Sequence, residues 1–354
     1  MRLAFLVADV RAEKPTYTTM YLAQAARELG HDVGLVGVSD LTLTADNQVA
    51  AAVTRAVPTT ASTQELCQAL ADNVQVTEEP LASFDVVFMR YHPHREGSGG
   101  QGPAIDFGWR LCLGGGLVVN DPEGTQRAGG RMYLSGLPEE IRPRTLITRE
   151  PAKVKAFLKS LDAPAVLKPL AEQHGGADNV FYVARGQVKN LNQIIAVVRK
   201  TGYVVVQEYL PEAAHGEKRL LLLGGEPIRV GNRVAIYRRL REVEAGEGLN
   251  GIAKKCPAGT RPGPIRSLRK RCEFGPVEQH IVDLLRPKLL ADGLYFVGVD
   301  IVGSKVLEVN VFTPGGIHAN RELYGIDVAG VVVRDLERRV AVRQAYKKST
   351  ERVA

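Results

Sequence analysis

Short apolar runs alternate with longer amphipathic segments along the first third of the chain. Residues 1–10 and 32–38 are apolar runs of strand length, and residues 18–31 carry apolar side chains at helical spacing up to Gly30. This pattern predicts a β-α-β opening. After a polar stretch rich in Thr and Ala, a strand, a helix and another strand are expected at 84–91, 104–113 and 116–121. Residues 1 to about 120 therefore predict an open α/β domain with a mostly parallel sheet.

The rest of the chain has a more mixed pattern. Polar, Gly-rich residues from 121 to 143 predict a linker with one short helix. A strand, a helix and two strands are then expected at 144–149, 150–161, 163–170 and 179–184. Beyond them, three antiparallel strands are expected at 203–210, 218–231 and 233–240. A loop, a helix, a hairpin and a basic helix complete the chain, at 241–275, 276–293, 297–314 and 331–354.

The composition is typical of a globular protein of two or three domains. The 354 residues are 45% hydrophobic and 24% charged, so the chain is long enough to bury sizeable cores. The longest apolar runs are far shorter than the ~20 residues that a membrane span requires, and Asp9 interrupts the amino-terminal run. We therefore expect neither a signal peptide nor a transmembrane segment.

Cysteine usage and net charge further limit the compartment and the binding partners expected for this protein. The chain has four cysteines: Cys67, Cys112, Cys256 and Cys272. They show neither the close pairing of a zinc site nor the density of a secreted disulfide scaffold, which favours a reducing cytoplasm. Much of the net charge of +7 lies in 261–271 and 331–352, and not in a stripe interleaved with aromatic residues. Solvated faces and attraction for small anionic substrates are therefore expected, rather than nucleic-acid binding.

The hairpin at 297–314 carries polar side chains in a segment otherwise built to be buried. A three-residue loop at 303–305 would place Asp300 across from Glu308, and Asn310 would share their face. Three oxygen donors on one rigid face are how proteins hold Mg²⁺ in nucleotide sites. The spacing supports equally an alternative in which Asp300 terminates a strand and the other two line a solvated face.

A second element joins a lysine to a pair of glycines. Lys168 ends an apolar strand, and the loop after Pro169 carries Gly175 and Gly176. A Gly pair lets backbone N–H groups aim at one point, and a lysine that reaches this point suits phosphate binding. By itself this pattern is also that of an ordinary turn with a surface lysine.

A third element is an extended strand that leads to an acid and an arginine. Its last residues offer backbone groups that could pair with an adenine: Gln207, Glu208, Tyr209 and Leu210. Glu217 would accept hydrogen bonds from ribose hydroxyls, and Arg219 would direct a bidentate donor at an anion beyond. Taken alone, the segment equally describes a strand edge with a surface salt bridge.

The three elements occur in the order found in ATP-grasp enzymes. Specifically, the chain resembles bacterial glutathione synthetase from its first strand to about Gly325. The similar segments read PRTLITR, VLKPL followed by GG, QEYLPEAAHGEKRLLLLGGEPI and GLYFVGVDIVGSKVLEVNVFTP. The resemblance implies an N-terminal open α/β domain followed by a two-lobed α+β ATP-grasp module. Its implied boundaries are 1–122 for the first domain, 123–202 for the small lobe with the phosphate loop, 203–330 for the large lobe with the metal site, and 331–354 for a basic helix.

The resemblance also implies an activity, namely an ATP-dependent ligase that phosphorylates a carboxylate and lets an amine displace the phosphate. Mg²⁺ held by the hairpin donors would neutralise phosphate charge, Lys168 and the glycine pair would position ATP, and Arg219 would steady the acyl-phosphate. The implied substrates are a small carboxylate and a small amine. Neither nucleic acid nor a membrane is expected as a partner, and a cytoplasmic homo-oligomer is expected.

Several positions depart from the family pattern. Arg131 stands where the family has a second nucleotide lysine, and a forked guanidinium can hold a phosphate there. In the loop that meets substrate, Asn250 is retained as an expected catalytic residue, but Gly248 replaces an arginine. Lys254 and Lys255 stand where two glycines belong.

Two further segments differ where substrate should lie. The phosphate loop reads AEQHGG, which makes His174 a candidate substrate contact, and an N-terminal segment reads MRYHPH. These changes leave open a ligase for another amino acid or peptide pair, or a nucleotide-binding protein without ligase activity.

Overall fold

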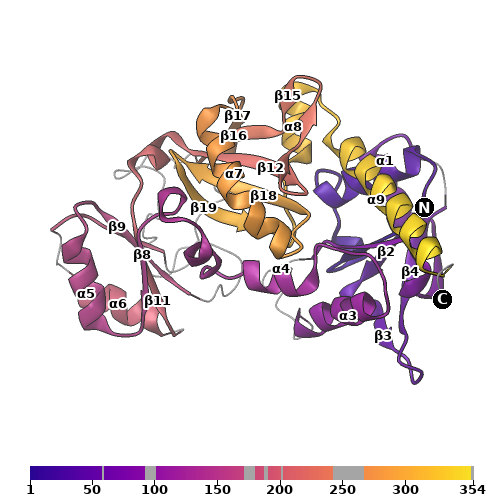
Figure 1. Cartoon of the computed structure of the whole chain (residues 1–354), viewed down its shortest axis with the longest axis horizontal. Coiled ribbons are helices and arrows are strands. Elements are labelled where there is room, and N and C mark those ends of the chain that lie inside the picture. Colours follow the sequence, from indigo (N-terminus) through magenta and orange to yellow (C-terminus); the bar gives the residue numbers. More distant parts are fainter. Residues whose placement is uncertain are drawn as a thin grey trace.

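The structure is a computed structural model that describes residues 1–57, 60–91, 101–170, 180–186, 190–200, 202–241 and 267–351. Figure 1 shows three parts in a row: an N-terminal domain, a central sheet with α7, and a smaller outer part. We call the outer part the small lobe (residues 145–208) and the central part the large lobe (residues 217–324). Among the described helices, none is long and apolar enough to cross a membrane.

The N-terminal domain is an open sheet with helices packed on it. Its parallel strands lie in the order β2-β1-β6-β7. Their bounds are Asp32–Gly37, Arg2–Val7, Val86–Met89 and Val118–Val119. The helices α1 and α3 span Thr18–Glu28 and Gln101–Leu113. The β-α-β opening and the open α/β domain expected from the sequence are confirmed, but the sheet is mixed and not mostly parallel, because three of its strand pairings are antiparallel.

The polar stretch after β2 contains elements that the sequence pattern missed. They are β3 (Leu41–Leu43), β4 (Val49–Ala56), α2 (Thr63–Asp72) and β5 (Val74–Pro80). β4 pairs antiparallel with β2, β3 and β5. β4 is rich in alanine and β5 is mostly exposed, so neither strand shows the run of large apolar residues by which buried strands are recognised.

Asn120 joins the N-terminal sheet to the large lobe. It follows β7 directly and is 2% exposed. Its amide nitrogen donates to the carbonyls of Phe296 and Val311 at 2.9 and 3.0 Å, and its Oδ1 accepts from the backbone N–H groups of Tyr295 and Phe296 at 2.8 and 2.7 Å. One buried amide thereby satisfies four backbone groups of two chain segments, which fixes the carboxyl edge of the N-terminal sheet against the large lobe.

The segment after Asn120 is a connection with short helical turns. α4 spans Pro122–Ala128, and two 3₁₀ turns follow at Tyr133–Gly136 and Glu139–Ile141. The α-helix corresponds to the short helix expected in the linker. Elsewhere, single 3₁₀ turns occur at Val10–Ala12, Val38–Asp40, Leu81–Ser83 and Pro211–His215.

The small lobe is a four-stranded antiparallel sheet in the order β10-β9-β11-β8. Its strands span Phe181–Val183, Ala165–Pro169, Val204–Glu208 and Thr145–Thr148. The helices α5 (Pro151–Ser160) and α6 (Leu191–Arg199) pack their apolar faces on it. β11 pairs with β8 and β9, so the expectation that residues 203–210 lie beside the strands at 218–240 is wrong.

The large lobe is built on a second antiparallel sheet in the order β17-β16-β12-β18-β19. Its strands span Ser267–Lys270, Ile236–Arg241, Glu217–Leu223, Phe296–Val302 and Lys305–Asn310. Short strands are β13 (Glu226–Pro227), β14 (Arg229–Val230) and β15 (Arg233–Val234). The helices are α7 (Pro276–Ala291) and α8 (Ile317–Tyr324).

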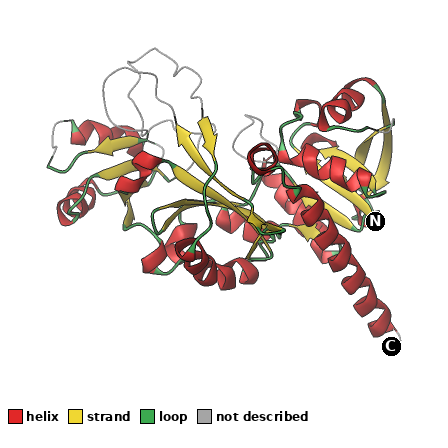
Figure 2. Cartoon of the chain, turned by 90° about the horizontal axis from the view of Figure 1, so that it is seen from above, coloured by secondary structure: helices red, strands yellow, loops and turns green. Residues whose placement is uncertain are grey.

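The terminal helix α9 spans Val328–Glu351 and packs back onto the N-terminal domain. Its apolar residues, such as Val332 and Leu336, are buried in one core with Met20 and Leu22 of α1. Tyr295 donates a hydrogen bond to Asp335 of this helix at 2.6 Å. Figure 2 shows that the end of α9 extends beyond the domain on which the helix packs.

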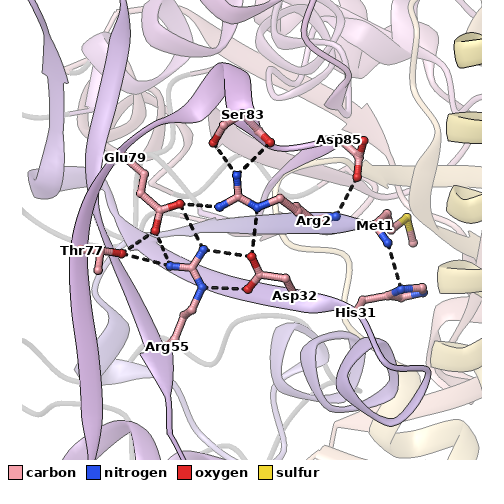
Figure 3. A network of polar contacts seen from close by, with 9 residues as sticks. All are labelled: Met1, Arg2, His31, Asp32, Arg55, Thr77, Glu79, Ser83 and Asp85. Atoms are coloured by element: carbon pink, nitrogen blue, oxygen red, sulfur yellow. Dashed lines mark hydrogen bonds and ion pairs between the residues drawn. The ribbon is translucent and has the colours of Figure 1, made fainter.

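A network of charged residues links the amino ends of β1 and β2 to residues of β4 and β5 (Figure 3). Arg2 and Arg55 both bridge Asp32 and Glu79, with Nε–Oδ distances of 3.0 and 2.8 Å to Asp32. Each arginine also donates to Glu79 at 2.5 Å. The hydrogen bond from Arg55 lowers the pKa of Glu79 to about 2. This cluster lies at the sheet edge opposite the carboxyl ends of β1 and β6.

The lowered pKa of Glu79 makes the stability of this domain pH-dependent. The ionised carboxylate stabilises the folded state above the unfolded pKa of 4.5, and this contribution is lost as the pH falls towards about 2. We expect Glu79→Gln to lower the free energy of unfolding at pH 7 by roughly 2 kcal/mol, and the difference from the native chain to shrink between pH 4.5 and 2. Urea denaturation at pH 7, 4.5 and 3 measures this. Glu78→Gln, at the exposed neighbouring position, is the control and should change the free energy of unfolding little. If the difference in unfolding free energy between Glu79→Gln and the native chain did not change with pH, the ionised Glu79 carboxylate would not be its cause.

Candidate active site

The β18–β19 hairpin places the expected metal ligands together. Asp300 pairs with Glu308, and Asn310 pairs with Gly298. The predicted three-residue loop is wrong: Val302 pairs with Lys305, so the turn has two residues. A register shift between Asp300 and Ile301 adds one residue to the partner strand, and this bulge restores the expected alignment of Asp300 with Glu308.

Asp300 is the centre of a buried charged cluster on the large-lobe sheet. It is 0% exposed. Arg219 of β12 donates two hydrogen bonds to its carboxylate, with Nε–Oδ1 and Nη2–Oδ2 distances of 2.7 and 2.5 Å. Arg239 of β16 donates to Oδ2 at 3.0 Å, and the amide of Asn310 donates to Oδ2 at 3.3 Å. Burial favours the neutral acid, but the charge and hydrogen bonds of Arg219 outweigh it, so the pKa of Asp300 lies below its ordinary value.

Strand register explains why these side chains meet. Arg219 pairs with Asp300 on one side and with Tyr237 on the other, and Glu217 pairs with Arg239. Arg239 donates to Glu217 at 2.6 Å through Nε. Sequence analysis missed Arg239, although it lies on the strand predicted at 233–240. The contact of Arg239 with Glu217 follows from the pairing of β16 with β12, which no local sequence pattern shows.

Two residues that were predicted to contact ligands contact protein groups in this structure. The bidentate donor of Arg219 meets Asp300, whereas an anion beyond the strand was expected. The Glu217 carboxylate accepts from Arg239, whereas ribose hydroxyls were expected. The cluster therefore holds both side chains in place through protein contacts.

On the small lobe, the polar ends of Lys168, Gln207 and Arg131 lie around the end of β9. Lys168 Nζ is 3.1 Å from Gln207 Oε1, and Gln207 donates to Thr145 Oγ1 at 3.3 Å. Arg131, beyond α4, donates to the carbonyl of Pro169. The two positive charges come from separate parts of the chain, with Arg131 at the last residue of β9 and Lys168 beside Gln207 of β11.

The stretch expected to pair with adenine is partly engaged within the protein. The N–H groups of Glu208 and Tyr209 donate to the carbonyls of Arg144 and Pro164 at 3.0 and 2.8 Å. The Glu208 carboxylate accepts from the N–H of Arg144 at 2.8 Å. The carbonyl of Leu210 accepts from the N–H of Ala213 at 3.0 Å, so this stretch makes several of its backbone hydrogen bonds within the protein.

Comparisons with known proteins identify the family to which this arrangement belongs. Residues 130–253 and 266–325 match the profile of the prokaryotic glutathione synthetase ATP-grasp domain, and residues 1–97 match that of its N-terminal domain. The chain belongs to the prokaryotic glutathione synthetase family. A glutathione synthetase of Synechococcus elongatus is 30% identical, with 95% of this chain and 98% of the relative aligned. One from Nostoc is 28% identical over 97% of this chain and 100% of its own length.

Solved structures agree on the fold. The ATP-grasp ligase PsnB, complexed with a phosphomimetic variant of its minimal precursor, Mg and ADP, matches with a TM-score of 0.60 at 15% identity, over 95% of this chain and 98% of PsnB. D-cycloserine synthetase DcsG matches with a TM-score of 0.58 at 16% identity, over 94% and 99%. The chain is therefore an ATP-dependent ligase of the glutathione synthetase type that forms a C–N amide bond.

The hairpin donors of this family member fit a magnesium ion. Within the described ranges, no group of three or more His, Cys, Asp or Glu side chains is arranged to hold a metal, but the predicted set consists of two carboxylates and an amide. Three of the four hydrogen bonds to Asp300 fall on Oδ2, so Oδ1 retains an acceptor lone pair. Glu308 is exposed, and Asn310 donates through its nitrogen, which leaves its Oδ1 as an acceptor.

Several predicted contacts of this ligase lie outside the described residues. They are Gly175, Gly176 and His174 of the phosphate loop, and Gly248, Asn250, Lys254 and Lys255 of the substrate loop. Their roles stay predictions.

Proposed function

We propose that the chain joins the cysteinyl carboxylate of γ-glutamylcysteine to the amine of glycine, with ATP and Mg²⁺. The buried Arg219–Asp300–Arg239 cluster beside Glu308 and Asn310 carries this proposal. It sets positive guanidinium groups next to a set of metal-binding oxygens. That combination suits transfer of a phosphoryl group to a carboxylate and stabilisation of the negative charge that develops.

The small-lobe residues would hold the nucleotide. Lys168 and Arg131 supply positive charge for the phosphates, together with the backbone N–H groups of Gly175 and Gly176. Gln207 holds the Lys168 ammonium group at 3.1 Å, so that group is positioned before ATP arrives. Glu208, Tyr209 and Leu210 would border the adenine, and Glu217 the ribose.

The large-lobe residues would act at the reacting carboxylate. Asp300, Glu308 and Asn310 would hold Mg²⁺, which supplies neutralising charge at the phosphates. Arg219 would stabilise the acyl-phosphate while Asp300 keeps its guanidinium in place. Asn250 would contact the substrate. The amine then attacks the acyl carbon, the C–N bond forms, and phosphate leaves with the electron pair of the broken C–O bond.

The direct test is a paired-substrate assay. The chain with ATP and Mg²⁺ should release phosphate quickly only when γ-glutamylcysteine and glycine are both present, and mass spectrometry should detect the tripeptide. Phosphate release that depends on a different pair would redirect the assignment to a related ligase, as the changes at Gly248, Lys254 and Lys255 allow. ATP binding without turnover for any pair would contradict the ligase assignment.

Lys168→Ala tests the nucleotide role of the small lobe. We expect the KM for ATP to rise about 10- to 100-fold, because a charge-assisted contact to phosphate contributes roughly 1.5–3 kcal/mol, while kcat at saturating ATP changes little. Lys159→Ala, at an exposed position of α5 in the same lobe, is the matched control. An unchanged KM for ATP in Lys168→Ala would show that this lysine does not bind the nucleotide.

We also propose that the enzyme works in the cytoplasm as a homo-oligomer. Cys67, Cys112 and Cys272 are free thiols, as a reducing compartment requires. Light scattering of the purified chain measures the oligomeric state.

A further inference from the structure

A groove between α9 and the start of β7 is lined mainly by arginines. Its volume is about 380 Å³, and its lining residues are Leu117, Arg338, Arg339, Val342 and Arg343. Four of these residues belong to α9, whereas Leu117 directly precedes β7 of the N-terminal domain. Pockets that bind small molecules measure about 300–1,000 Å³, so the groove is large enough for a small ligand. None of its lining residues is assigned to ATP, the metal or the joined substrates.

The lining residues of α9 occupy one side of the helix near its end. Among the described residues of α9, Val340 is the last that is buried in the core shared with α1, and residues 341–346 are exposed. Side chains three and four residues apart are neighbours on a helix. This spacing brings three arginines and one valine together in the groove. Much of the positive charge noted in the C-terminal segment therefore faces a defined depression.

Asp335 holds two of the guanidinium groups. Its Oδ1 accepts from Nε of Arg338 at 3.2 Å, and its Oδ2 accepts from Nε of Arg339 at 2.9 Å. Burial would raise the pKa of Asp335, but hydrogen bonds from Tyr295, Arg338 and Arg339 outweigh it, so the pKa lies below its ordinary value. Among the described contacts, Asp335 is the only carboxylate that pairs with either arginine. One negative charge thus faces two positive charges.

Arg339 and Arg343 are also anchored outside α9. The guanidinium carbon of Arg339 lies 4.2 Å from the ring centroid of Tyr295 in the large lobe. Nη2 of Arg343 donates to the carbonyl of Gly115, two residues before Leu117. Arg343 forms no ion pair with any described residue. Donors that are held in place lose less side-chain entropy when they bind a ligand, so these contacts prepare the groove for an anion.

The chemistry of the lining favours a phosphate joined to an apolar group. Three of the five lining residues are arginines and none is acidic, and guanidinium groups bind phosphate through paired N–H donors. Leu117 and Val342 offer apolar contacts beside them, and Val342 is 50% exposed. A second copy of α9 in the same place would bring like charges together, which disfavours self-association through this groove.

We propose that this groove binds a small organic phosphate, with the phosphate at Arg338 and Arg343 and the apolar part against Leu117 and Val342. The ligand is soluble and is not one of the molecules that the ligase joins. The inference is independent of the identity of the carboxylate and the amine. Since α9 packs on the N-terminal domain and Asp335 bonds Tyr295 of the large lobe, the ligand would contact the helix that connects these two parts.

Two probes that differ only in the phosphate test the groove. 1-Naphthyl phosphate has it, and 1-naphthol lacks it. Saturation-transfer NMR titrations use the full chain with and without saturating AMPPNP and Mg²⁺, which would occupy the proposed nucleotide site. We expect 1-naphthyl phosphate to bind with a Kd of about 0.1–1 mM under both conditions, and 1-naphthol to bind about 10-fold more weakly or less. The Kd of the phosphate should rise with salt concentration.

Substitutions in α9 test the lining residues. The double variant Arg338→Gln, Arg343→Gln should weaken binding of 1-naphthyl phosphate about 10-fold or more. Val342→Glu keeps all three arginines and sets a negative charge among them, so it should abolish binding, whereas Val342→Gln should retain most of it. Arg334→Gln removes an exposed arginine of the same helix that does not line the groove and should leave the Kd unchanged. Thermal unfolding midpoints close to the native one would show that the variants are folded.

Several outcomes would overturn the inference. They are equal affinities for the two probes, an unchanged Kd in folded Val342→Glu, and loss of probe binding when AMPPNP is added, which would place the probe in the nucleotide site. Sedimentation with vesicles of phosphatidylcholine and phosphatidylserine tests a lipid as the source of the phosphate. Binding to these vesicles without any signal from 1-naphthyl phosphate would assign the arginines to a membrane surface instead. Because no readout requires amide formation, the inference and the proposed function fail independently.

Discussion

Glu308→Gln is expected to reduce kcat by about 10³-fold, which corresponds to about 4 kcal/mol of transition-state stabilisation. The substitution keeps the size of the side chain and removes one ligand charge from the proposed magnesium site. Glu308 is exposed on β19, so we expect the fold to be retained. Steady-state phosphate release at several Mg²⁺ concentrations measures the effect, and the concentration of Mg²⁺ needed for half-maximal rate should rise.

A matched substitution shows whether this effect is specific to the site. Glu226→Gln removes the same charge from an exposed position of β13 in the same lobe, where the carboxylate pairs only with Arg286 at 2.8 Å among its described contacts. Its turnover should stay close to that of the native enzyme. A rate for Glu308→Gln within about tenfold of the native rate, with normal Mg²⁺ dependence, would exclude Glu308 as a metal ligand.

Arg219→Leu is expected to destabilise the fold as well as to abolish turnover. Asp300 is fully buried and receives two hydrogen bonds from Arg219. Removal of the arginine leaves Arg239 and Asn310 as the remaining donors to this carboxylate among the described residues. Breaking a buried pair in this way costs about 3 kcal/mol or more. Urea denaturation of the variant should show a lower midpoint with an unchanged m-value.

A second variant separates the stability effect from the catalytic one. Arg219→Leu combined with Asp300→Leu removes both charges, and most of the lost stability should return while activity stays absent. Arg233→Leu, at an exposed position of β15, controls for loss of an arginine and should change stability by less than about 0.5 kcal/mol. If the single and the double variant were equally unstable, the uncompensated Asp300 charge would not be the cause.

Local patterns predicted the parts of the site that lie close in sequence. Asp300, Glu308 and Asn310 belong to one hairpin, and the two-residue period of strands puts them on one face. The prediction of their alignment succeeded although the turn is one residue shorter than expected, because a bulge compensates. Lys168 and Gln207 were also identified, but their contact at 3.1 Å required β11 to pair with β9, whereas the sequence suggested other neighbours for β11.

The sequence by itself determined the β-α-β opening, the antiparallel hairpin and the alignment of Asp300 with Glu308, because periodicity and turn chemistry act over a few residues. Only the tertiary structure decided which charges meet. Arg219 and Arg239 lie on strands that are far from Asp300 in sequence, and their convergence follows from the alignment of β12, β16 and β18. Arg90 is the same case, since its contacts with Leu6 and Pro314 form only once β1, β6 and the chain after β19 are packed together. Pairings between distant strands depend on the whole core, and no local pattern contains that information.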